Sequence, residues 1–260
     1  MLNKIHNFYK NNQHKKELCC FSFLFLLCIV IFKIFPNTDL IFSSFFYDAN
    51  NKTWLIDRES NLLWLHYRGL PYLGEFLLFL IISFVLISFF TNNKNNKNNK
   101  NNIKNKLINN IRIRKNFWLF LLCAALVGPI AITETIKTFS GRTRPINTQN
   151  FNGKLLYTPP LQQANQCKKN CSFVSGHVSA ASFILAFFWF VGKKRYIYFA
   201  LSFLFIISTM FARIIPGGHF LSDCIFGFFV TYFSLWLTEL LFYLFNIKIT
   251  NYKLQITNNK

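Results

Sequence analysis

The stretch that decides the fold is residues 196–245, YIYFALSFLFIISTMFARIIPGGHFLSDCIFGFFVTYFSLWLTELLFYLF. It contains two long apolar runs, Tyr196–Ala212 and Leu221–Phe245, joined by a short polar segment with Pro216 followed by two glycines. A helix of about 17–25 mainly apolar residues can cross the hydrocarbon core of a bilayer. Pro-Gly-Gly favours a tight turn. The stretch therefore predicts a hairpin of two membrane-spanning helices.

Six apolar runs of this kind occur along the 260-residue chain, in which 52% of the residues are apolar and 34 are Phe. A soluble domain could bury one such run but not six. We therefore predict an all-α integral membrane protein, a bundle of six transmembrane helices that forms one membrane-embedded domain over residues 1–260. The predicted spans are Leu18–Phe35, Tyr72–Phe90, Phe117–Ile136, Ser175–Val191, Tyr196–Ala212 and Leu221–Phe245.

Two of these runs have features of their own. The first is long for the apolar core of a signal peptide, and no A-x-A cleavage site follows it, so we expect it to be retained as an anchor. The third contains Gly128-Pro129. Because proline cannot donate a backbone hydrogen bond, this dipeptide predicts a kink in the third span.

The basic residues lie mostly in the segments between the runs. A formal net charge of +20 could indicate a nucleic-acid-binding protein, but this distribution reports membrane topology instead, and we predict no nucleic-acid partner. The N-terminus, second loop, fourth loop and C-terminus are basic and fall on one side, so both termini are predicted to be cytoplasmic. The first loop mixes charges and falls outside. The third loop, Lys137–Phe173, also falls outside although it is basic, so its cations need another explanation.

Residues 91–110 form a low-complexity loop on the predicted cytoplasmic side, where Asn92–Asn102 repeats Asn-Asn-Lys. Such a composition predicts disorder. We interpret the loop as a linker and topology signal. The alternative is contact with anionic lipid at the inner leaflet.

Five of the seven cysteines lie in apolar runs, where cysteine acts as a small apolar residue. Cys167 and Cys171 instead lie in the polar third loop at C-x3-C spacing. Two cysteines without a neighbouring histidine make a poor zinc site. If the loop faces an oxidising compartment, they can form a local disulfide, and the sequence leaves this open.

Three polar clusters mark the predicted outer ends of the spans. The first follows the third span and contains Lys137, Arg142 and Arg144, with Gly141 and Pro145 shaping the turn. Any one basic residue at a membrane surface can be an interfacial anchor. Three cations within eight residues suit a phosphate group better.

The second cluster, Ser175-Gly176-His177, leads directly into the fourth span. Serine is a good N-cap, and glycine lets backbone amides approach a ligand closely. A helix N-terminus also attracts anions. The alternative is a plain helix cap with an interfacial histidine.

The third cluster surrounds the turn between the last two spans. Arg213 ends one helix, His219 begins the next, and Asp223 follows four residues later on the same helical face. A carboxylate beside an imidazole fixes its tautomer and raises its basicity, which prepares histidine as a nucleophile. The alternative is a structural Arg–Asp pair with an uninvolved histidine.

Together the clusters predict a phosphoryl-transfer site with a cationic cradle, helix-end amides, an attacking histidine and a second histidine that protonates the leaving oxygen. The sequence offers no carboxylate cluster for Mg²⁺ or Zn²⁺, so we predict a metal-free mechanism without a cofactor.

The patterns K-x6-R-P, S-G-H and R-x5-H-x3-D resemble the type 2 phosphatidic acid phosphatase family of lipid phosphate phosphatases, which is related to the vanadium haloperoxidases. The resemblance covers the third to the sixth span. Two positions depart from the family pattern: Val174 replaces the usual Pro, and Ala212 the usual Ser. A weaker resemblance, in Phe151-Asn-Gly153 and in the run from Cys167 to Phe173, points to the lipid A phosphatase branch.

The resemblance implies that His219 attacks phosphorus and carries a phosphohistidine, oriented by Asp223. His177 would protonate the leaving group and later activate water. The phosphate oxygens would be held by Lys137, Arg144, Ser175, Gly176 and Arg213.

The expected reaction is hydrolysis of a phosphomonoester or diphosphate on a membrane lipid, at the outer face of a bacterial cytoplasmic (inner) membrane. A lipid A phosphate is the first expected substrate, followed by undecaprenyl diphosphate and phosphatidylglycerol phosphate. A lipid phosphotransferase using the same site and a non-catalytic anion-binding transporter are the alternatives. The oligomeric state is left open.

Overall fold

The computed structural model describes residue 5 and residues 15–90, 107–108, 110–111, 113–191 and 195–249. The predicted low-complexity loop at about 91–110 lies almost entirely outside the described residues. So do most of the basic residues on which the predicted orientation of the termini rests.

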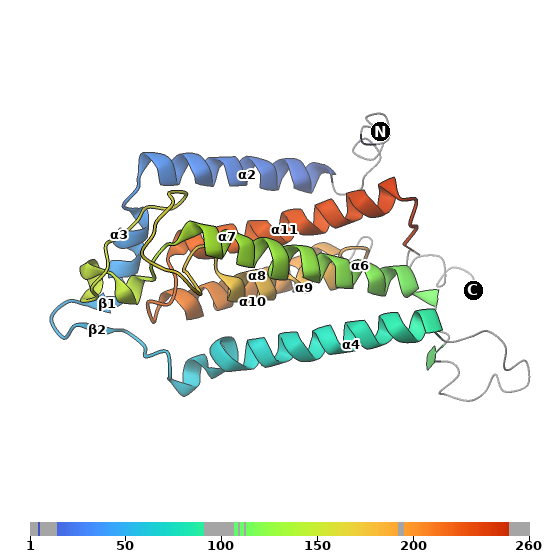
Figure 1. Cartoon of the computed structure of the whole chain (residues 1–260), viewed down its shortest axis with the longest axis horizontal. Helices are drawn as coiled ribbons and strands as arrows, with labels where there is room; N and C mark the ends of the chain where they lie inside the picture. Colours follow the sequence, from blue (N-terminus) through green and yellow to red (C-terminus); the bar gives the residue numbers. More distant parts are fainter. Residues whose placement is uncertain are drawn as a thin grey trace, which may run out of the picture.

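Helices that run along a common axis form the body of the molecule (Figure 1). The segments η3 (Leu126–Ile132) and α7 (Thr133–Ser140) continue directly from α6 (Lys115–Ala125). The other helices of the body are α2 (Lys15–Ile34), α4 (Leu70–Phe90), α8 (Gly176–Ser182), α9 (Ile184–Phe187), α10 (Arg195–Ile214) and α11 (Leu221–Leu244).

Short elements gather at one end of this bundle, which we call the loop end (Figure 1). The turn between α10 and α11 lies there, together with the antiparallel pair of β1 and β2 and the segment 141–175. The short elements are α3 (Thr38–Ser44), β1 (Tyr47–Asp48), β2 (Thr53–Trp54), η1 (Asn61–Leu63), η2 (Leu65–Gly69), η4 (Pro145–Asn147) and η5 (Gln149–Phe151).

Five helices in the described residues are long and apolar enough to cross a membrane: Lys15–Ile34, Leu65–Phe90, Lys115–Asn147, Tyr196–Ile214 and Leu221–Leu244. They correspond to five of the six predicted spans. The predicted fourth span, Ser175–Val191, is instead two short helices, α8 and α9, within the apolar stretch Gly176–Phe187. Because that stretch is shorter than a regular crossing, the count of six stays a prediction. The predicted hairpin is confirmed, since only six residues separate α10 from α11.

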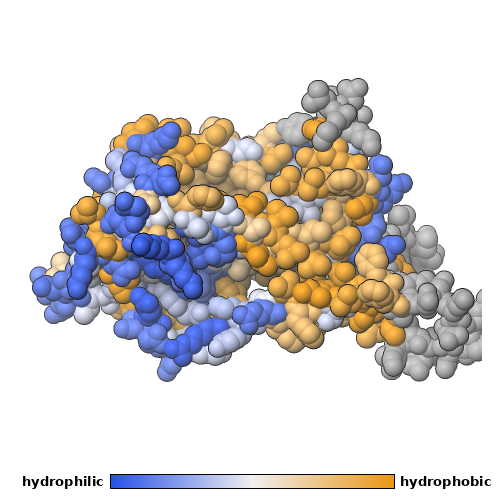
Figure 2. Space-filling model, viewed as in Figure 1, coloured by the Kyte–Doolittle hydropathy of each residue, from blue (hydrophilic) through white to orange (hydrophobic). Residues whose placement is uncertain are grey.

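The distribution of apolar side chains fits a bundle surrounded by lipid. α2 and α4 bury few residues and expose large apolar side chains, whereas α11 is the most buried of the five long helices. Figure 2 shows hydrophobic residues over the body of the bundle and hydrophilic residues concentrated at the loop end. This pattern is typical of a membrane protein, because soluble proteins rarely expose apolar surface so continuously.

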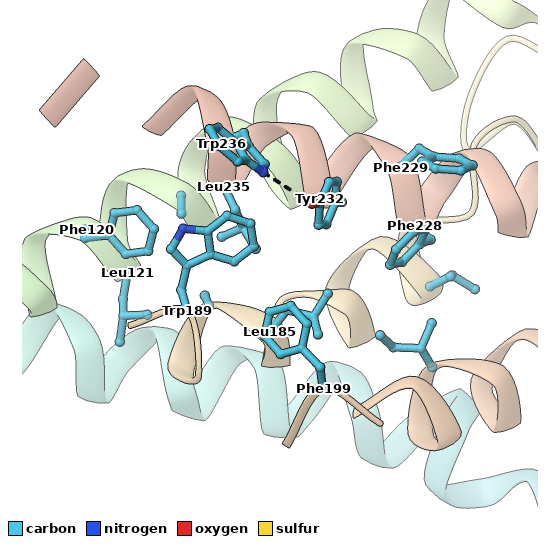
Figure 3. Close-up of a cluster of buried hydrophobic side chains, with 14 of the residues drawn as sticks. Phe120, Leu121, Leu185, Trp189, Phe199, Phe228, Phe229, Tyr232, Leu235 and Trp236 are labelled. Carbon is cyan, nitrogen blue, oxygen red and sulfur yellow. Dashed lines mark hydrogen bonds between the residues drawn. The ribbon is translucent and has the colours of Figure 1, made fainter. Parts of the chain in front are cut away.

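The centre of the bundle is an aromatic cluster around Trp189, which is fully buried. Its ring packs against Tyr232 and Trp236 of α11 and against Phe199 of α10 (Figure 3). The indole Nε1 donates a hydrogen bond to Glu239 Oε2 at 2.8 Å, which satisfies the polar atom of a buried side chain. These contacts tie the end of the α8–α9 segment to α11.

The third span, where Gly128-Pro129 predicts a kink, contains η3, a π-helical segment between α6 and α7 with Pro129 inside it. The kink itself stays a prediction. The hydroxyl of Thr133 donates to the Gly128 carbonyl at 3.0 Å, which satisfies a carbonyl near the irregularity. Gly128 also packs directly on α11, where an added Cβ would lie 2.1 Å from Ser234 Oγ.

Replacing Gly128 by Ala is therefore expected to destabilise the protein in detergent. The new methyl group overpacks the contact with α11, which typically costs about 1–3 kcal/mol, while the helix-propensity gain of Ala over Gly is at most about 1 kcal/mol. The thermal unfolding midpoints of wild type, Gly128→Ala, Ser234→Gly and the double variant give a double-mutant cycle for this contact. We expect Ser234→Gly to restore part of the loss. Additive effects would contradict the contact.

Candidate active site

His219 lies in the turn between α10 and α11 and is almost fully buried. Its backbone N–H donates to the Arg213 carbonyl at 3.0 Å, so the turn fixes its position relative to the end of α10. Asp223 lies in the first turn of α11, and its Oδ2 atom accepts the Phe220 backbone N–H at 2.8 Å. The same Oδ2 lies 3.6 Å from His219 Nδ1. This separation is longer than a hydrogen bond, and such contacts often tighten when substrate binds.

Asp223 is held by groups from two other parts of the chain. Ser172 donates its hydroxyl to Oδ2 and also lies 3.5 Å from His219 Nδ1. The backbone N–H of Ser175 donates to the Asp223 carbonyl at 2.9 Å. This bond requires a glycine at position 227, because a Cβ there would lie 2.8 Å from the Ser175 carbonyl oxygen. The second cluster is thereby fixed against the third.

Arg142 connects the site to the first loop. Its guanidinium donates to Asp223 Oδ1 at 2.6 Å and to Asp39 Oδ2 at 2.7 Å, and all three side chains are at most 1% exposed. Ser222 binds the same groups, since its hydroxyl and its N–H both donate to Asp39. The Arg142 guanidinium also packs 4.4 Å from the centre of the Phe220 ring. Arg142 is therefore fully engaged within the protein.

Lys137 and Arg144 meet at Asn170. Both donate to Asn170 Oδ1, at 3.2 Å from Lys137 Nζ and 2.9 Å from Arg144 Nη2. Arg144 Nη1 also donates to the Gly218 carbonyl, one residue before His219. A Cβ at Gly176 would lie 3.6 Å from Lys137 Nζ, so the start of α8 is directly beside this ammonium group.

Tyr67 of η2 completes the site from the start of the second span. The guanidinium carbon of Arg213 lies 3.7 Å from the centre of the Tyr67 ring. The Tyr67 carbonyl lies 3.4 Å from His177 Nε2. Within the described part of the chain, no hydrogen bond is made by the buried Tyr67 and Ser175 hydroxyls or by Arg213 Nε and Nη1. Buried polar groups are rarely left this way, so this cluster suits a polar ligand.

The electrostatic surroundings keep His219 neutral. Burial, followed by the charges of Arg144 and Arg213, lowers the pKa of His219 well below its ordinary value. A neutral imidazole at pH 7 retains the lone pair that an attacking nitrogen needs.

The structure brings the eight predicted site residues to one place, linked through Asn170, Gly218, Tyr67 and Asp223: Lys137, Arg144, Ser175, Gly176, His177, Arg213, His219 and Asp223. Arg142 belongs to the first cationic cluster but not to the phosphate-binding residues that the resemblance implies, and it contacts the two aspartates. Sequence reasoning missed five residues: Asp39, Tyr67, Asn170, Ser172 and Ser222. Asp39 was visible only as one of several charges in the first loop. Asn170 and Ser172 lie in the run from Cys167 to Phe173 that resembles the lipid A phosphatase branch, but nothing there assigned them a role. Tyr67 and Ser222 carried no signal.

The third loop is cross-linked by a disulfide between Cys167 and Cys171, whose Cα atoms are 5.5 Å apart. This settles the pairing that the sequence left open. In the described residues, no three His, Cys, Asp or Glu side chains are grouped so that they could hold a metal ion. The metal-free mechanism stays a prediction.

An apolar helical bundle with a histidine, an aspartate and several cations buried at one end fits a membrane enzyme that acts on a phosphate group. The family model described as "PAP2 superfamily" matches residues 118–247. The chain therefore belongs to the PAP2 superfamily.

Curated relatives agree in activity class. A lipid A 4'-phosphatase of Francisella tularensis subsp. novicida (strain U112) is 28% identical over 228 residues, which is 87% of this chain and 93% of the relative. A lipid A 4'-phosphatase of Rhizobium leguminosarum is 36% identical over 104 residues, 39% of this chain and 45% of the relative. No solved structure matches the chain. With the family, these relatives identify the chain as a phosphoric monoester hydrolase.

Arg142→Gln and Arg144→Gln are expected to have different effects although both remove one positive charge. Without Arg142 two carboxylates remain buried without a counter-charge, which typically costs about 3–5 kcal/mol, so the unfolding midpoint should fall by several degrees. Arg144 is only partly buried, and its replacement should mainly raise KM. Thermal unfolding and steady-state kinetics of both variants check this. Equal loss of stability in the two would contradict the assignment.

Proposed function

We propose that the protein is a lipid phosphatase that hydrolyses a phosphomonoester on a membrane lipid through a phosphohistidine on His219. The observation that carries the proposal is the position of His219, a buried neutral imidazole with Asp223 Oδ2 3.6 Å from Nδ1 and with cations nearby. Because Asp223 faces Nδ1, the other ring nitrogen, Nε2, is the one left to attack phosphorus.

The reaction proceeds in two steps. In the first, His219 Nε2 forms a bond to phosphorus while the bond from phosphorus to the lipid oxygen breaks, and His177 donates a proton to that oxygen. In the second, His177 takes a proton from water, the water oxygen attacks phosphorus, and the N–P bond breaks to release inorganic phosphate. Asp223 stabilises the positive charge that develops on His219.

Cationic side chains, together with donors that make no hydrogen bond within the described residues, hold the phosphate oxygens. Lys137, Arg144 and Arg213 supply positive charge, and two nitrogens of Arg213 make no hydrogen bond within the described residues. The Ser175 hydroxyl and the Gly176 amide add two donors where α8 begins. Donors aimed at charge that develops in the transition state are usually the largest contribution to such catalysis.

An apolar groove beside the site supports a lipid substrate. It has a volume of about 330 Å³ and is lined by residues of α4, η3, α8, α9 and α10, among them Leu73, Ile81, Pro129, Ala181 and Phe205. Ala181 lies about one helical turn beyond His177 on α8. Leu73 is 47% exposed, so the groove opens on the outside of the bundle. An acyl chain lying there leaves its head group at the loop end.

A lipid A phosphate is the first proposed substrate, because the relatives that match 87% and 39% of this chain are lipid A 4'-phosphatases. Undecaprenyl diphosphate and phosphatidylglycerol phosphate follow. The proposed location is the inner membrane of a bacterium, with the loop end in the periplasm. The disulfide in the third loop supports that orientation, because disulfides persist in oxidising compartments.

Two other functions use the same features. A lipid phosphotransferase would pass the phosphoryl group from His219 to a lipid hydroxyl instead of water. A non-catalytic anion transporter would need the cations alone. The pairing of His219 with Asp223 and Ser172 favours an enzyme, because an anion-binding site has no use for a nucleophile with its own carboxylate.

The test is phosphate release by purified protein from a panel of these lipids. We expect wild-type activity that EDTA does not reduce, a loss of at least about 10³-fold in His219→Ala, and a large loss in His177→Ala. His66→Ala is the matched control, because the His66 side chain contacts Ser208 and Phe205 on the neighbouring helix and none of the residues proposed to attack or hold the phosphate.

Release from no lipid, or full activity in His219→Ala, would contradict the proposal. Radiolabelled phosphate appearing on an added lipid acceptor faster than in solution would favour the phosphotransferase.

A further inference from the structure

A second pocket lies at the loop end, beside the proposed phosphate site and separate from the apolar groove. Its volume is about 380 Å³, and most of its lining side chains are polar or charged, among them Thr143, Arg144, Gln166, Lys168, Lys169 and Asn170. We call it the loop pocket. Arg144 and Asn170 belong both to this pocket and to the cradle around His219, so the two sites are contiguous.

The loop pocket carries a strong excess of positive charge. Three of its lining residues are cations, Arg144, Lys168 and Lys169, and none of its lining residues is an aspartate or glutamate. Like charges gathered around a cavity without a counter-charge are unfavourable unless an anion joins them. The proposed chemistry at His219 uses Arg144 and leaves Lys168 and Lys169 unexplained.

The wall that carries these lysines is fixed in place. The disulfide between Cys167 and Cys171 closes the loop around Lys168 and Lys169. The Cys167 backbone N–H donates to the Gly141 carbonyl at 3.0 Å, and the Ser172 N–H donates to the Arg142 carbonyl at 2.8 Å. The loop is thus held against the chain that leads into Thr143. A rigid wall of this kind pays little entropy when it binds a ligand.

A buried hydroxyl points to a ligand independently of the charges. Thr143 is 2% exposed, and its Oγ1 makes no hydrogen bond within the described part of the chain although the residue lines the loop pocket. Buried hydroxyls nearly always have a partner. A phosphate or sugar oxygen entering the pocket would supply one.

We propose that the loop pocket binds a second phosphate group on the head group of the same substrate lipid. The phosphate to be hydrolysed lies at His219, with the acyl chains toward the apolar groove. The second phosphate lies against Lys168 and Lys169, near the Thr143 hydroxyl. The inference rests on the proposed function and specifies it further: the substrate is a lipid whose head group carries two phosphates.

The experiment compares two synthetic disaccharide lipids with identical acyl chains, one carrying two phosphates and the other only the phosphate that is hydrolysed. KM for each is measured in mixed micelles with wild type, K168Q/K169Q, Thr143→Val and the control Lys154→Gln. Lys154 is an exposed lysine of the same loop that does not line the pocket. Because a charged contact is lost, K168Q/K169Q should reduce the wild-type preference for the bis-phosphorylated lipid by about tenfold. Thr143→Val should reduce it by a smaller factor, and Lys154→Gln should not change it.

If K168Q/K169Q keeps the wild-type preference for the bis-phosphorylated lipid, the proposal is overturned. It is also overturned if Lys154→Gln reduces that preference as much as K168Q/K169Q does, because this would indicate general attraction by a basic surface. Binding of the two lipids to His219→Ala, with and without K168Q/K169Q, separates this inference from the proposed function. In one outcome, wild type hydrolyses neither lipid, but His219→Ala binds the bis-phosphorylated lipid more tightly and loses this preference when K168Q/K169Q is added. The pocket assignment then stands and the phosphatase proposal fails. If wild type hydrolyses both lipids without preference, the phosphatase stands and the pocket assignment fails.

Discussion

The guanidinium of Arg142 lies between two buried carboxylates, and the loop end is organised around this contact. It joins Asp223 of α11 to Asp39 of the first loop, while its own backbone carbonyl binds the Ser172 amide. Three segments far apart in the sequence are thereby fixed relative to His219. Such a network is stable only when it is complete, because each charge would be costly to bury alone.

Around this network the bundle separates two kinds of surroundings. The apolar groove between α4 and α8 lies within about a turn of His177, and the cationic cradle and the loop pocket lie on the polar side. A lipid phosphate has the same division between acyl chains and a charged head group. The proposed site lies where the two parts of such a molecule meet. In the proposed orientation, this role accounts for the basic loop after the third span, on the side where the positive-inside rule expects few cations.

The sequence predicted much of this arrangement because its signals are local. Apolar runs predicted the long helices, and Pro216-Gly217-Gly218 predicted the hairpin. Gly128-Pro129 marked the part of the third span that is π-helical, although the sequence predicted a kink there. The fourth span was less well predicted, because hydropathy does not reveal that the helix is interrupted between Ser182 and Ile184. The partners of Arg142 could not be predicted for a similar reason. Its spacing from Lys137 and Arg144 suggests a phosphate ligand, and only the fold reveals that Asp39, 103 residues away, is its partner.

The proposed mechanism requires that phosphate becomes covalently bonded to His219. The decisive measurement is to mix purified protein with a lipid labelled with radioactive phosphate, stop the reaction with alkali within milliseconds to seconds, and locate the label by peptide mapping. We predict a label that is stable in alkali, labile in acid and confined to the peptide containing His219. Two results would contradict this mechanism. One is rapid release of phosphate without any protein-bound label, both in wild type and in His177→Ala, where the second step is slowed. The other is label on any residue except His219.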